Sequence, residues 1–555
     1  MRGVKEATGS WRRRGELLLG MGFCAVLGAA ALLRGDALGD PLAAGRTLYR
    51  NGTLPSGAPV SAVVQGDVPM SGAQAACSSC HRRSGFGSNE GIAAAPPVVG
   101  ALLYRPVAPV NRLIERPRAV ALRSAYTDQT LARAIRDGVD PDGRPLGPMM
   151  PRFALDDPSM AALIGYLRSL SPGPDPGVEA DTIHLAVVIA GEVRPARRQA
   201  VLEVMKGFTT AKNALTRREF DRRAYARRRG AVEYRAYRAW ALHVWELTGP
   251  PATWERQLAA EYRAQPVFAL VGGISDSTWA PVRQFCEQQG IPGLLPQVPV
   301  ADASADDFYT VYFSRGLPLE GEVLARYLQG DGSKVKPILQ VFRRDGVGEA
   351  GAEALKSSAG MATTDAVTLE AGQPLTPATW GEIASRCRGC DLVLWLRDVD
   401  LGGLAEATPL LGSAAHIVFS ATLLGGDQAV PAGLRSRALL MYPYDLPDKL
   451  EDRMRRPMIW LRSQGLAGDE ERVRVDTLFA ATLAGEALKE LDAYLSRDLL
   501  LERVEHMLES TLPTSSYPRL TLSPGDRFAA KGCFVVRPAT QAGGKVTALS
   551  DWIVP

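Results

Sequence analysis

The chain has 555 residues, of which 46% are hydrophobic and 22% are charged, as is ordinary for globular proteins. At about 100 to 200 residues per domain, this length predicts about two to four domains, each with a core of its own. The formal net charge is only +4, and lysine and arginine are spread along most of the chain. We therefore expect no nucleic-acid partner.

The N-terminus has the pattern of an export segment. Three arginines at 12–14 precede an uncharged, mostly apolar run over 17–33, which predicts that residues 1–36 form a signal peptide or a membrane anchor. Small residues at 37–39 offer a cleavage site, but the run is also just long enough to span a bilayer as an uncleaved anchor, so both fates stay open. The rest of the chain should then lie on the periplasmic side of a bacterial inner membrane.

The stretch Cys77-Ser78-Ser79-Cys80-His81 is the most specific motif. Two cysteines separated by two residues and followed by histidine are the attachment pattern of a c-type haem. The thiols of Cys77 and Cys80 would add to the two porphyrin vinyl groups, and His81 would be the proximal iron ligand. Zinc is the alternative, but it would need two further ligands, and no other cysteine or histidine lies near this stretch. We therefore predict one covalently bound haem c.

The segments around this motif read as a small helical domain over 41–171. A short helix over 43–52 ends at a glycine, a second is expected over 127–138 with an N-cap at Thr127 or Asp128 and a glycine stop, and a third over 158–170. A polar loop precedes the motif. A long interval over 86–125 contains scattered arginines, which suit either a basic rim for an acidic redox partner or the haem propionates, or a solvated loop.

With the loop 143–153, these segments resemble the single-haem class I cytochrome c domain from end to end. The resemblance implies that the methionine before Pro151, Met150, is the distal iron ligand, with Met149 as the alternative. Ligation by histidine and methionine raises the reduction potential relative to two nitrogen ligands, which suits an electron carrier.

A proline- and glycine-rich stretch over 171–177 marks a linker, which we place at 172–180. After it, a continuous apolar run over 182–191 is typical of a buried parallel strand. Further strands are expected at 243–247, 267–273, 336–342 and 391–396, and helices at 197–214, 252–263, 279–289 and 319–329. A second helical stretch, rich in arginine, is expected over 217–240. This alternation predicts an α/β architecture with parallel sheets.

The pattern over 181–540 resembles the type I periplasmic binding proteins, the two-lobed receptors of branched-chain amino acid and amide uptake. The pieces that support this resemblance are the strand 268–273 before a helix, the turn 290–292 and the closing segment 517–528. The resemblance implies three crossings between lobes, expected near 299–303, 420–424 and 515–521, and leaves 541–555 as a C-terminal tail. The predicted fold is therefore multidomain: an all-α cytochrome c domain followed by a two-lobed α/β domain.

A ligand would lie between the lobes, at strand ends and helix N-termini, where backbone N–H groups can hold an anion. This places Ser275, Asp276, Ser277 and Thr278 in the cleft from one lobe and Tyr312, Ser314 and Arg315 from the other. These residues also have alternative structural roles: the serines and the threonine suit helix caps, and the arginine suits a surface ion pair.

The remaining cysteines point to structure. Cys387 and Cys390 predict a local disulfide in an exported protein, with a redox dithiol as the alternative, and Cys286 and Cys533 either pair or stay free. The sequence contains no P-loop, no G-x-S-x-G, no H-E-x-x-H and no dinucleotide-binding fingerprint. We therefore expect an electron carrier and binding protein and no enzyme.

These features predict a periplasmic c-type cytochrome with a fused solute-binding-like module. Its partners would be a periplasmic redox protein such as a dehydrogenase, a small-molecule ligand, and the membrane through the N-terminal segment. The alternative is a small-molecule receptor or sensor of the transporter-associated type in which the haem domain is accessory.

Overall fold

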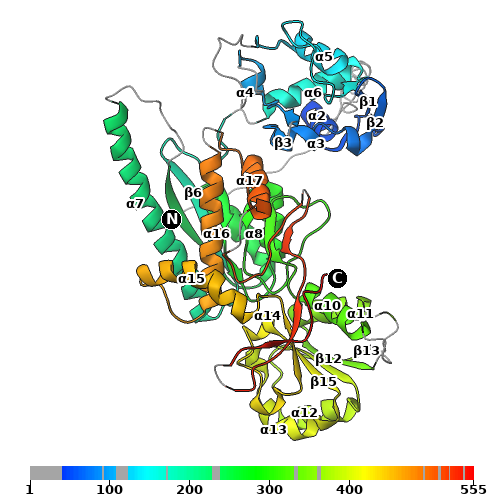
Figure 1. Cartoon of the computed structure of the whole chain (residues 1–555), viewed down its shortest axis with the longest axis vertical. Helices are drawn as coiled ribbons and strands as arrows, with labels where there is room; N and C mark the ends of the chain where they lie inside the picture. Colours follow the sequence, from blue (N-terminus) through cyan, green and yellow to red (C-terminus); the bar gives the residue numbers. More distant parts are fainter. Residues whose placement is uncertain are drawn as a thin grey trace, which may run out of the picture. The chain divides into compact units, whose positions relative to one another are not determined.

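The computed structural model describes residues 40–90, 93–107, 123–170, 173–227, 238–330, 336–358, 360, 364–491, 494–510, 514–523, 525–541 and 544–555. The chain divides into two compact units, Met1–Pro172 and Gly173–Pro555, which are coloured by sequence in Figure 1. The predicted signal or anchor segment lies outside the described residues, as does the middle of the long arginine-containing interval. In the part of the chain that is described, no helix is both long and apolar enough to cross a membrane.

The first unit is built on helices, and the first and last of those described, α2 (Pro41–Asn51) and α6 (Asp157–Ser169), pack closely against each other. A Cβ atom added at Gly45 would lie 2.1 Å from the carbonyl oxygen of Ala162, so only glycine permits this approach. The rings of Tyr49 and Tyr166 lie 5.4 Å apart across the same contact. The described helices between them in the chain are α3 (Ser78–His81), α4 (Gly100–Leu103) and α5 (Asp128–Asp137).

The helix predicted over 127–138 is confirmed together with both of its caps. The hydroxyl of Thr127 accepts a hydrogen bond from the backbone N–H of Thr130 at 3.2 Å, so it is the N-cap. Gly138 ends the helix in the left-handed conformation at φ 69°, which a glycine adopts without strain.

The first unit also contains β-structure that the sequence did not reveal. The segment expected to be a polar loop before the haem motif folds into a hairpin, which joins the strand after the methionine loop to form a sheet of order β2-β1-β5. The strands are β1 (Ser61–Val64), β2 (Val68–Ser71), β3 (Ser88–Glu90), β4 (Ala93–Ala95) and β5 (Arg152–Phe153). They are too short for a period-two pattern to stand out.

The second unit has two lobes, each with its own sheet. The first lobe has a parallel sheet of order β17-β11-β10-β8-β6-β7, with β9 also paired to β6. Its strands are β6 (Thr182–Ala190), β7 (Ala239–Leu247), β8 (Ala269–Val271), β9 (Ile274–Ser275), β10 (Gly293–Leu294), β11 (Thr310–Ser314) and β17 (Phe528–Ala530). Its helices are α7 (Pro195–Arg227), α8 (Trp254–Ala264), α9 (Ala280–Gln289), α15 (Pro447–Ser463), α16 (Glu471–Glu490) and α17 (Arg497–Ser510).

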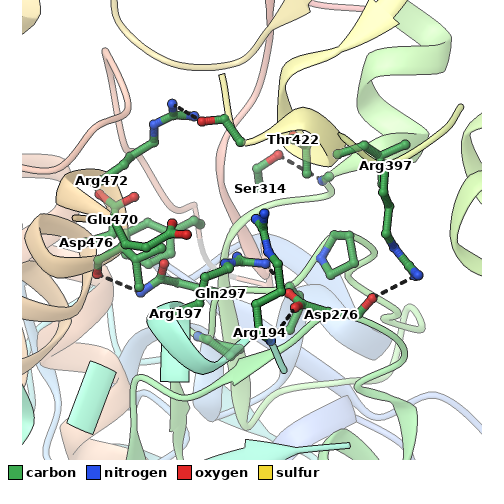
Figure 2. Close-up of a pocket in the computed structure, with 18 of the residues that line it drawn as sticks. Arg194, Arg197, Asp276, Gln297, Ser314, Arg397, Thr422, Glu470, Arg472 and Asp476 are labelled. Atoms are coloured by element: carbon green, nitrogen blue, oxygen red, sulfur yellow. Dashed lines mark hydrogen bonds and ion pairs between the residues drawn. The ribbon is translucent and has the colours of Figure 1, made fainter. Parts of the chain in front are cut away.

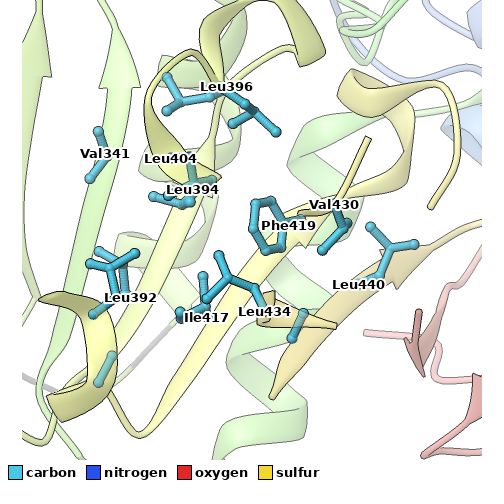
Figure 3. Packing of buried hydrophobic residues seen from close by; sticks show 14 of the residues in the cluster. Val341, Leu392, Leu394, Leu396, Leu404, Ile417, Phe419, Val430, Leu434 and Leu440 are labelled. Carbon is cyan, nitrogen blue, oxygen red and sulfur yellow. The ribbon is translucent and has the colours of Figure 1, made fainter. Parts of the chain in front are cut away.

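The second lobe has a seven-stranded sheet of order β13-β12-β14-β15-β16-β18-β19, parallel except for the last two pairings. Figure 3 shows side chains from several of these strands, among them Leu392, Ile417 and Phe419, meeting in one apolar layer. The strands are β12 (Ile338–Arg343), β13 (Thr364–Leu369), β14 (Asp391–Trp395), β15 (His416–Ser420), β16 (Ala438–Tyr442), β18 (Phe534–Arg537) and β19 (Thr547–Ala548). The helices are α10 (Leu317–Gln329), α11 (Val347–Ser358), α12 (Pro377–Arg386), α13 (Leu404–Ala407) and α14 (Ala421–Leu424).

The crossings between lobes lie at other positions than the sequence predicts. The chain leaves the first sheet after β11 and enters the second lobe at α10, returns after β16, and crosses a third time between β17 and β18. Residues 299–303 precede β11 in the first lobe, and residues 420–424 lie inside the second lobe at β15 and α14. These two predictions were wrong, and so was the third, since residues 515–521 precede β17 of the first sheet. A buried parallel strand is a continuous apolar run whichever sheet it joins, so its sequence does not tell the lobe.

The segments next to the lobes are tied into the second unit. The carboxylate of Asp175, in the predicted linker, accepts a hydrogen bond from the backbone N–H of Arg497 at 2.6 Å. The buried guanidinium of Arg497 donates to the carbonyl oxygens of Pro176 and Val267 at 3.1 and 2.7 Å. At the other end, β19 in the predicted C-terminal tail pairs with β18.

The four described cysteines outside the haem motif are structural. Cys387 and Cys390 form the predicted local disulfide. Cys286 and Cys533 stay free and buried, and burial raises the pKa of the Cys286 thiol to about 12. Neutral, inaccessible thiols of this kind are poor nucleophiles.

Candidate functional site

The first candidate site is the haem-attachment motif on α3. Cys77 caps the helix and is half-buried, Cys80 is exposed, and both thiols are free. Burial raises the pKa of the Cys77 thiol to about 12, so this group is a neutral thiol.

The imidazole of His81 is oriented by one hydrogen bond. His81 is 7% exposed, and its Nδ1 lies 2.8 Å from the carbonyl oxygen of Pro96. A carbonyl oxygen only accepts, so Nδ1 carries the hydrogen and Nε2 keeps its lone pair. Burial lowers the pKa of His81, which keeps the ring neutral. An Nε2 lone pair fixed in this way is what an iron ligand requires.

The donor set of this region therefore fits a haem c. Cys77 and Cys80 would form the two thioether bonds, and His81 would supply the proximal nitrogen. Among the described residues, no group of three or more histidines, cysteines, aspartates and glutamates could hold a metal ion, so the zinc alternative lacks its further ligands. Bound there, a haem would supply one-electron chemistry.

The two methionines of the distal loop differ in exposure. Met149 is 58% exposed, whereas Met150 is half-buried. A side chain directed into solvent is a poorer ligand for a buried iron than a half-buried one, so the difference favours Met150. It remains a prediction that Met150 is the distal ligand.

The second candidate site is a cavity of about 220 Å³ between the two lobes of the second unit. It lies beyond the carboxyl ends of parallel strands from both sheets, where α/β proteins commonly bind ligands. Figure 2 shows charged side chains converging on it from both lobes, with Arg194, Arg197 and Asp276 near one another and Arg472 and Asp476 at the other side.

Three of its arginines are already paired with carboxylates or carbonyls of the protein. Arg197 forms an ion pair with Asp276, within the first lobe. Arg194 reaches across the cleft to Asp398 of the second lobe, with 2.8 Å between Nη1 and Oδ2. Arg397 of the second lobe donates to the backbone oxygen of Asp276 at 3.0 Å. Charged contacts of the protein itself therefore bridge the lobes at this side of the cavity.

Arg472 and Asp476 form the other polar wall. They lie four residues apart on α16, so they share one helix face, and neither makes an ion pair within 4.0 Å with any described residue. Arg472 donates to the backbone oxygen of Gly425 at 2.8 Å and lies 3.9 Å from the ring centre of Tyr444. The carboxylate of Asp476 accepts from the backbone N–H and hydroxyl of Ser516 at 2.7 and 2.6 Å.

Asp476 is buried, with 4% of the residue exposed. Burial raises its pKa to about 6, because removing water disfavours the charged form, while the two bonds from Ser516 and the charge of Arg472 oppose the shift. Among the described residues that line the cavity, Arg472 and the buried Asp476 have no ion pair, and neither do the less buried acids Glu192 and Glu470.

The structure brings only part of the predicted cleft set to this cavity. Asp276 and Ser314 line it. The hydroxyl of Ser275 accepts from the backbone N–H of Ser277, and that of Thr278 accepts from Ala280 at the start of α9, so these three serve the turn.

The two remaining predicted cleft residues also lie elsewhere than in the cavity lining. Tyr312 is fully buried in the core of the first lobe, where its hydroxyl donates to the backbone oxygen of Asp302 and its ring stacks on Phe528. Arg315 pairs with Glu322 at 2.8 Å.

Sequence reasoning missed the most polar lining residues. Arg194 follows the end of β6 and directly precedes α7, the same strand-to-helix position that pointed to Asp276, so it was within reach. Arg472 and Asp476 carry no such signal, because their helix starts far along the chain and reaches the cavity only through the fold.

Comparison with known proteins gives separate matches for the two parts of the chain. Residues 72–171 match the cytochrome c family model. No curated protein matches the sequence. Solved structures resemble the second unit: a possible leucine/isoleucine/valine-binding protein from Rhodopirellula baltica has 13% identity and a TM-score of 0.49, covering 67% of this chain and 97% of its own.

Two other solved structures give the same picture. A branched-chain amino acid transporter protein from Thermus thermophilus, with bound valine, has 12% identity and a TM-score of 0.47 over 68% of this chain and 97% of its own. A type 1 periplasmic binding protein from Bordetella pertussis has 14% identity and a TM-score of 0.48 over 67% of this chain and 100% of its own. Residues 72–171 therefore form a cytochrome c domain, and a separate α/β unit with two sheets follows it in the chain.

Proposed function

We propose that this protein is a periplasmic electron carrier with one covalent haem c, fused to a solute-binding-like module. The observation that carries the proposal is the attachment motif on α3, in which Pro96 fixes the neutral imidazole of His81 with Nε2 available. Cys77 and Cys80 would attach the porphyrin, and Met150 would complete the iron coordination. Electrons would pass from a periplasmic dehydrogenase through the haem toward the respiratory chain.

The pyridine haemochrome spectrum of the full chain, purified from a periplasm with haem-attachment machinery, tests this proposal. The wild type should retain its haem after acid-acetone extraction, and the double variant Cys77→Ser, Cys80→Ser should release it. Cys533→Ser, which changes a buried free cysteine of the other unit, is the matched control and should keep the haem. A wild type without covalent haem would refute the proposal.

The cavity supports the second candidate function, a receptor for a small solute. Arg472 and Asp476 have opposite charges and line one cavity without an ion-pair partner among the described residues. That arrangement suits a small molecule that carries an anionic and a cationic group, such as a free amino acid.

Thermal unfolding with added leucine and valine as probes tests the receptor function. Binding only to the folded state raises the unfolding temperature in a saturable way, and Arg472→Gln should abolish the shift. Arg315→Gln, at an ion pair outside the cavity, should leave it intact. If neither probe shifts the wild type, these amino acids are not its ligands and the electron-carrier function stands alone.

A further inference from the structure

The distal loop presents two adjacent methionines, and the protein must direct one of them to the iron. Given the proposed haem, residues of the surrounding fold must make that choice. The loop turns tightly, with the backbone N–H of Met150 donating to the oxygen of Gly147 at 3.1 Å. Adjacent side chains leave such a turn in different directions, so its backbone position decides which sulfur faces inward.

The hairpin β1–β2 holds this loop from one side. Ala62 and Val63 pair with Phe153 and Arg152 in the strand that directly follows the loop. At the hairpin turn, the backbone N–H of Gln65 donates to the carbonyl oxygen of Pro148 at 3.0 Å. Backbone hydrogen bonds therefore connect the hairpin to residues on both sides of the two methionines.

The side chain of Gln65 makes a further contact with the loop. Its Nε2 lies 3.2 Å from the Sδ atom of Met149, within donor distance of a thioether. This contact lies at the surface, in keeping with the 58% exposure of Met149. A sulfur held there by an amide is directed away from the half-buried side of the loop.

Arg152 holds the loop from the opposite end. Its guanidinium donates to the backbone oxygen of Met150 and to that of Leu146, the latter at 3.4 Å. The carbonyl groups on both sides of the turn are thus fixed while the side chain of Met150 has no hydrogen bond in the described structure.

The backbone of Gln65 is strained, as it is at three other described residues that are not glycine. Its φ of 55° lies in the left-handed region that glycine adopts freely and glutamine rarely does. Gly66 next to it also has a positive φ, as a tight hairpin turn requires. Because glycine would adopt this backbone conformation without strain, the presence of glutamine indicates that its side chain has a function at this position.

We propose that the β1–β2 hairpin clamps the methionine loop and that Gln65 is a positioning residue, which holds Met149 outward and leaves Met150 to ligate the iron.

Two substitutions of Gln65 separate positioning from stability. Gln65→Gly relieves the backbone strain, and Gln65→Asn tolerates the left-handed conformation but is too short to reach Met149. In the ferric protein, both should weaken the Fe–S charge-transfer band and speed displacement of methionine by cyanide about fivefold, the factor of one net hydrogen bond. The unfolding temperature of Gln65→Gly should not fall, because glycine relieves the backbone strain. If Gln65 had only a structural role, its replacement would lower the unfolding temperature.

Substitution of each methionine completes the test. Met150→Leu should lose the Fe–S band, and Met149→Leu should keep it. Loss of the band in Met149→Leu, or wild-type spectra and cyanide rates in both Gln65 variants, would overturn the clamp. All of these measurements use protein that has covalently bound haem. They are therefore distinct from failure of the proposed function, in which the wild type itself would bind no haem.

Discussion

At the scale of single residues, Glu320 on α10 is the most unusual acid of the second unit. It is fully buried, and its Oε1 accepts a hydrogen bond from Thr422, which lines the cavity. Its Oε2 has no hydrogen-bond partner among the described residues. Burial raises the pKa of Glu320 from 4.5 to about 7, although hydrogen bonds from Ser420 and Thr422 oppose the shift.

This raised pKa makes stability depend on pH. Because the folded-state pKa lies above the unfolded value, the folded state keeps a proton that the unfolded state releases between pH 4.5 and about 7. The contribution of Glu320 to stability therefore falls as pH rises through that range. As pH rises between these limits, the free energy of unfolding of Glu320→Gln should therefore increase relative to that of the wild type by on the order of 3 kcal/mol.

Denaturant unfolding followed by tryptophan fluorescence measures this difference, since every tryptophan except Trp11 lies in the second unit. Glu322→Gln, on the same helix but in a surface ion pair, is the control and should show little change with pH. If the free energy of unfolding changed with pH in the same way for wild type and Glu320→Gln, the pKa of Glu320 would not be raised in the folded state.

Functional residues could be predicted from the sequence where a short local motif marks them. Cys77, Cys80 and His81 lie in one short motif whose spacing is itself the requirement of the chemistry. Arg472 and Asp476 reach the cavity from a late helix that packs back on the first lobe. Nothing near them in the sequence distinguishes them from surface charges of a solvated helix.

At the scale of elements, an ion pair joins the strand ends of the two lobes across the cleft. Arg194, before α7, and Asp398, after β14, form an ion pair across it, and both side chains are partly exposed. Partly exposed pairs contribute up to about 1 kcal/mol, which is enough to bias a two-state equilibrium several-fold.

Arg194→Gln should therefore increase the population of open lobes by about two- to fivefold at low salt. Spin labels at Leu215→Cys and Leu410→Cys, exposed positions in the first and second lobes, report the distance between the lobes in protein with reduced haem. Arg198→Gln removes an ion pair within the first lobe only and is the control. An interlobe distance distribution that Arg194→Gln leaves unchanged would contradict a role of this pair in closure.

The sequence predicted long elements better than short ones. The apolar run after the linker and the strand at 391–396 were found within a residue or two as β6 and β14, because a buried parallel strand is a continuous hydrophobic run. The helix expected over 197–214 and the arginine-rich stretch after it belong in part to one longer helix, α7. The hairpin β1–β2 was missed, because its strands have only four residues each.

At the scale of the whole molecule, the order of the parts was predictable, but the path between the lobes was not. A change of composition near the Pro-Gly stretch separates the cytochrome domain from the α/β unit, and the two compact units divide at 172–173. The side of the cleft on which each strand lies depends on long-range pairing. For example, β17 joins the first sheet, whereas β18, a few residues later, joins the second.

The central claim is that this chain carries electrons on one haem, and a potentiometric titration of the full chain tests it most directly. The absorbance of the haem, followed while the potential is changed, should trace one reversible one-electron step with one haem per chain. Methionine and histidine ligation should place the step above that of a bis-histidine haem. Absence of haem absorbance, or an irreversible change, would contradict the account.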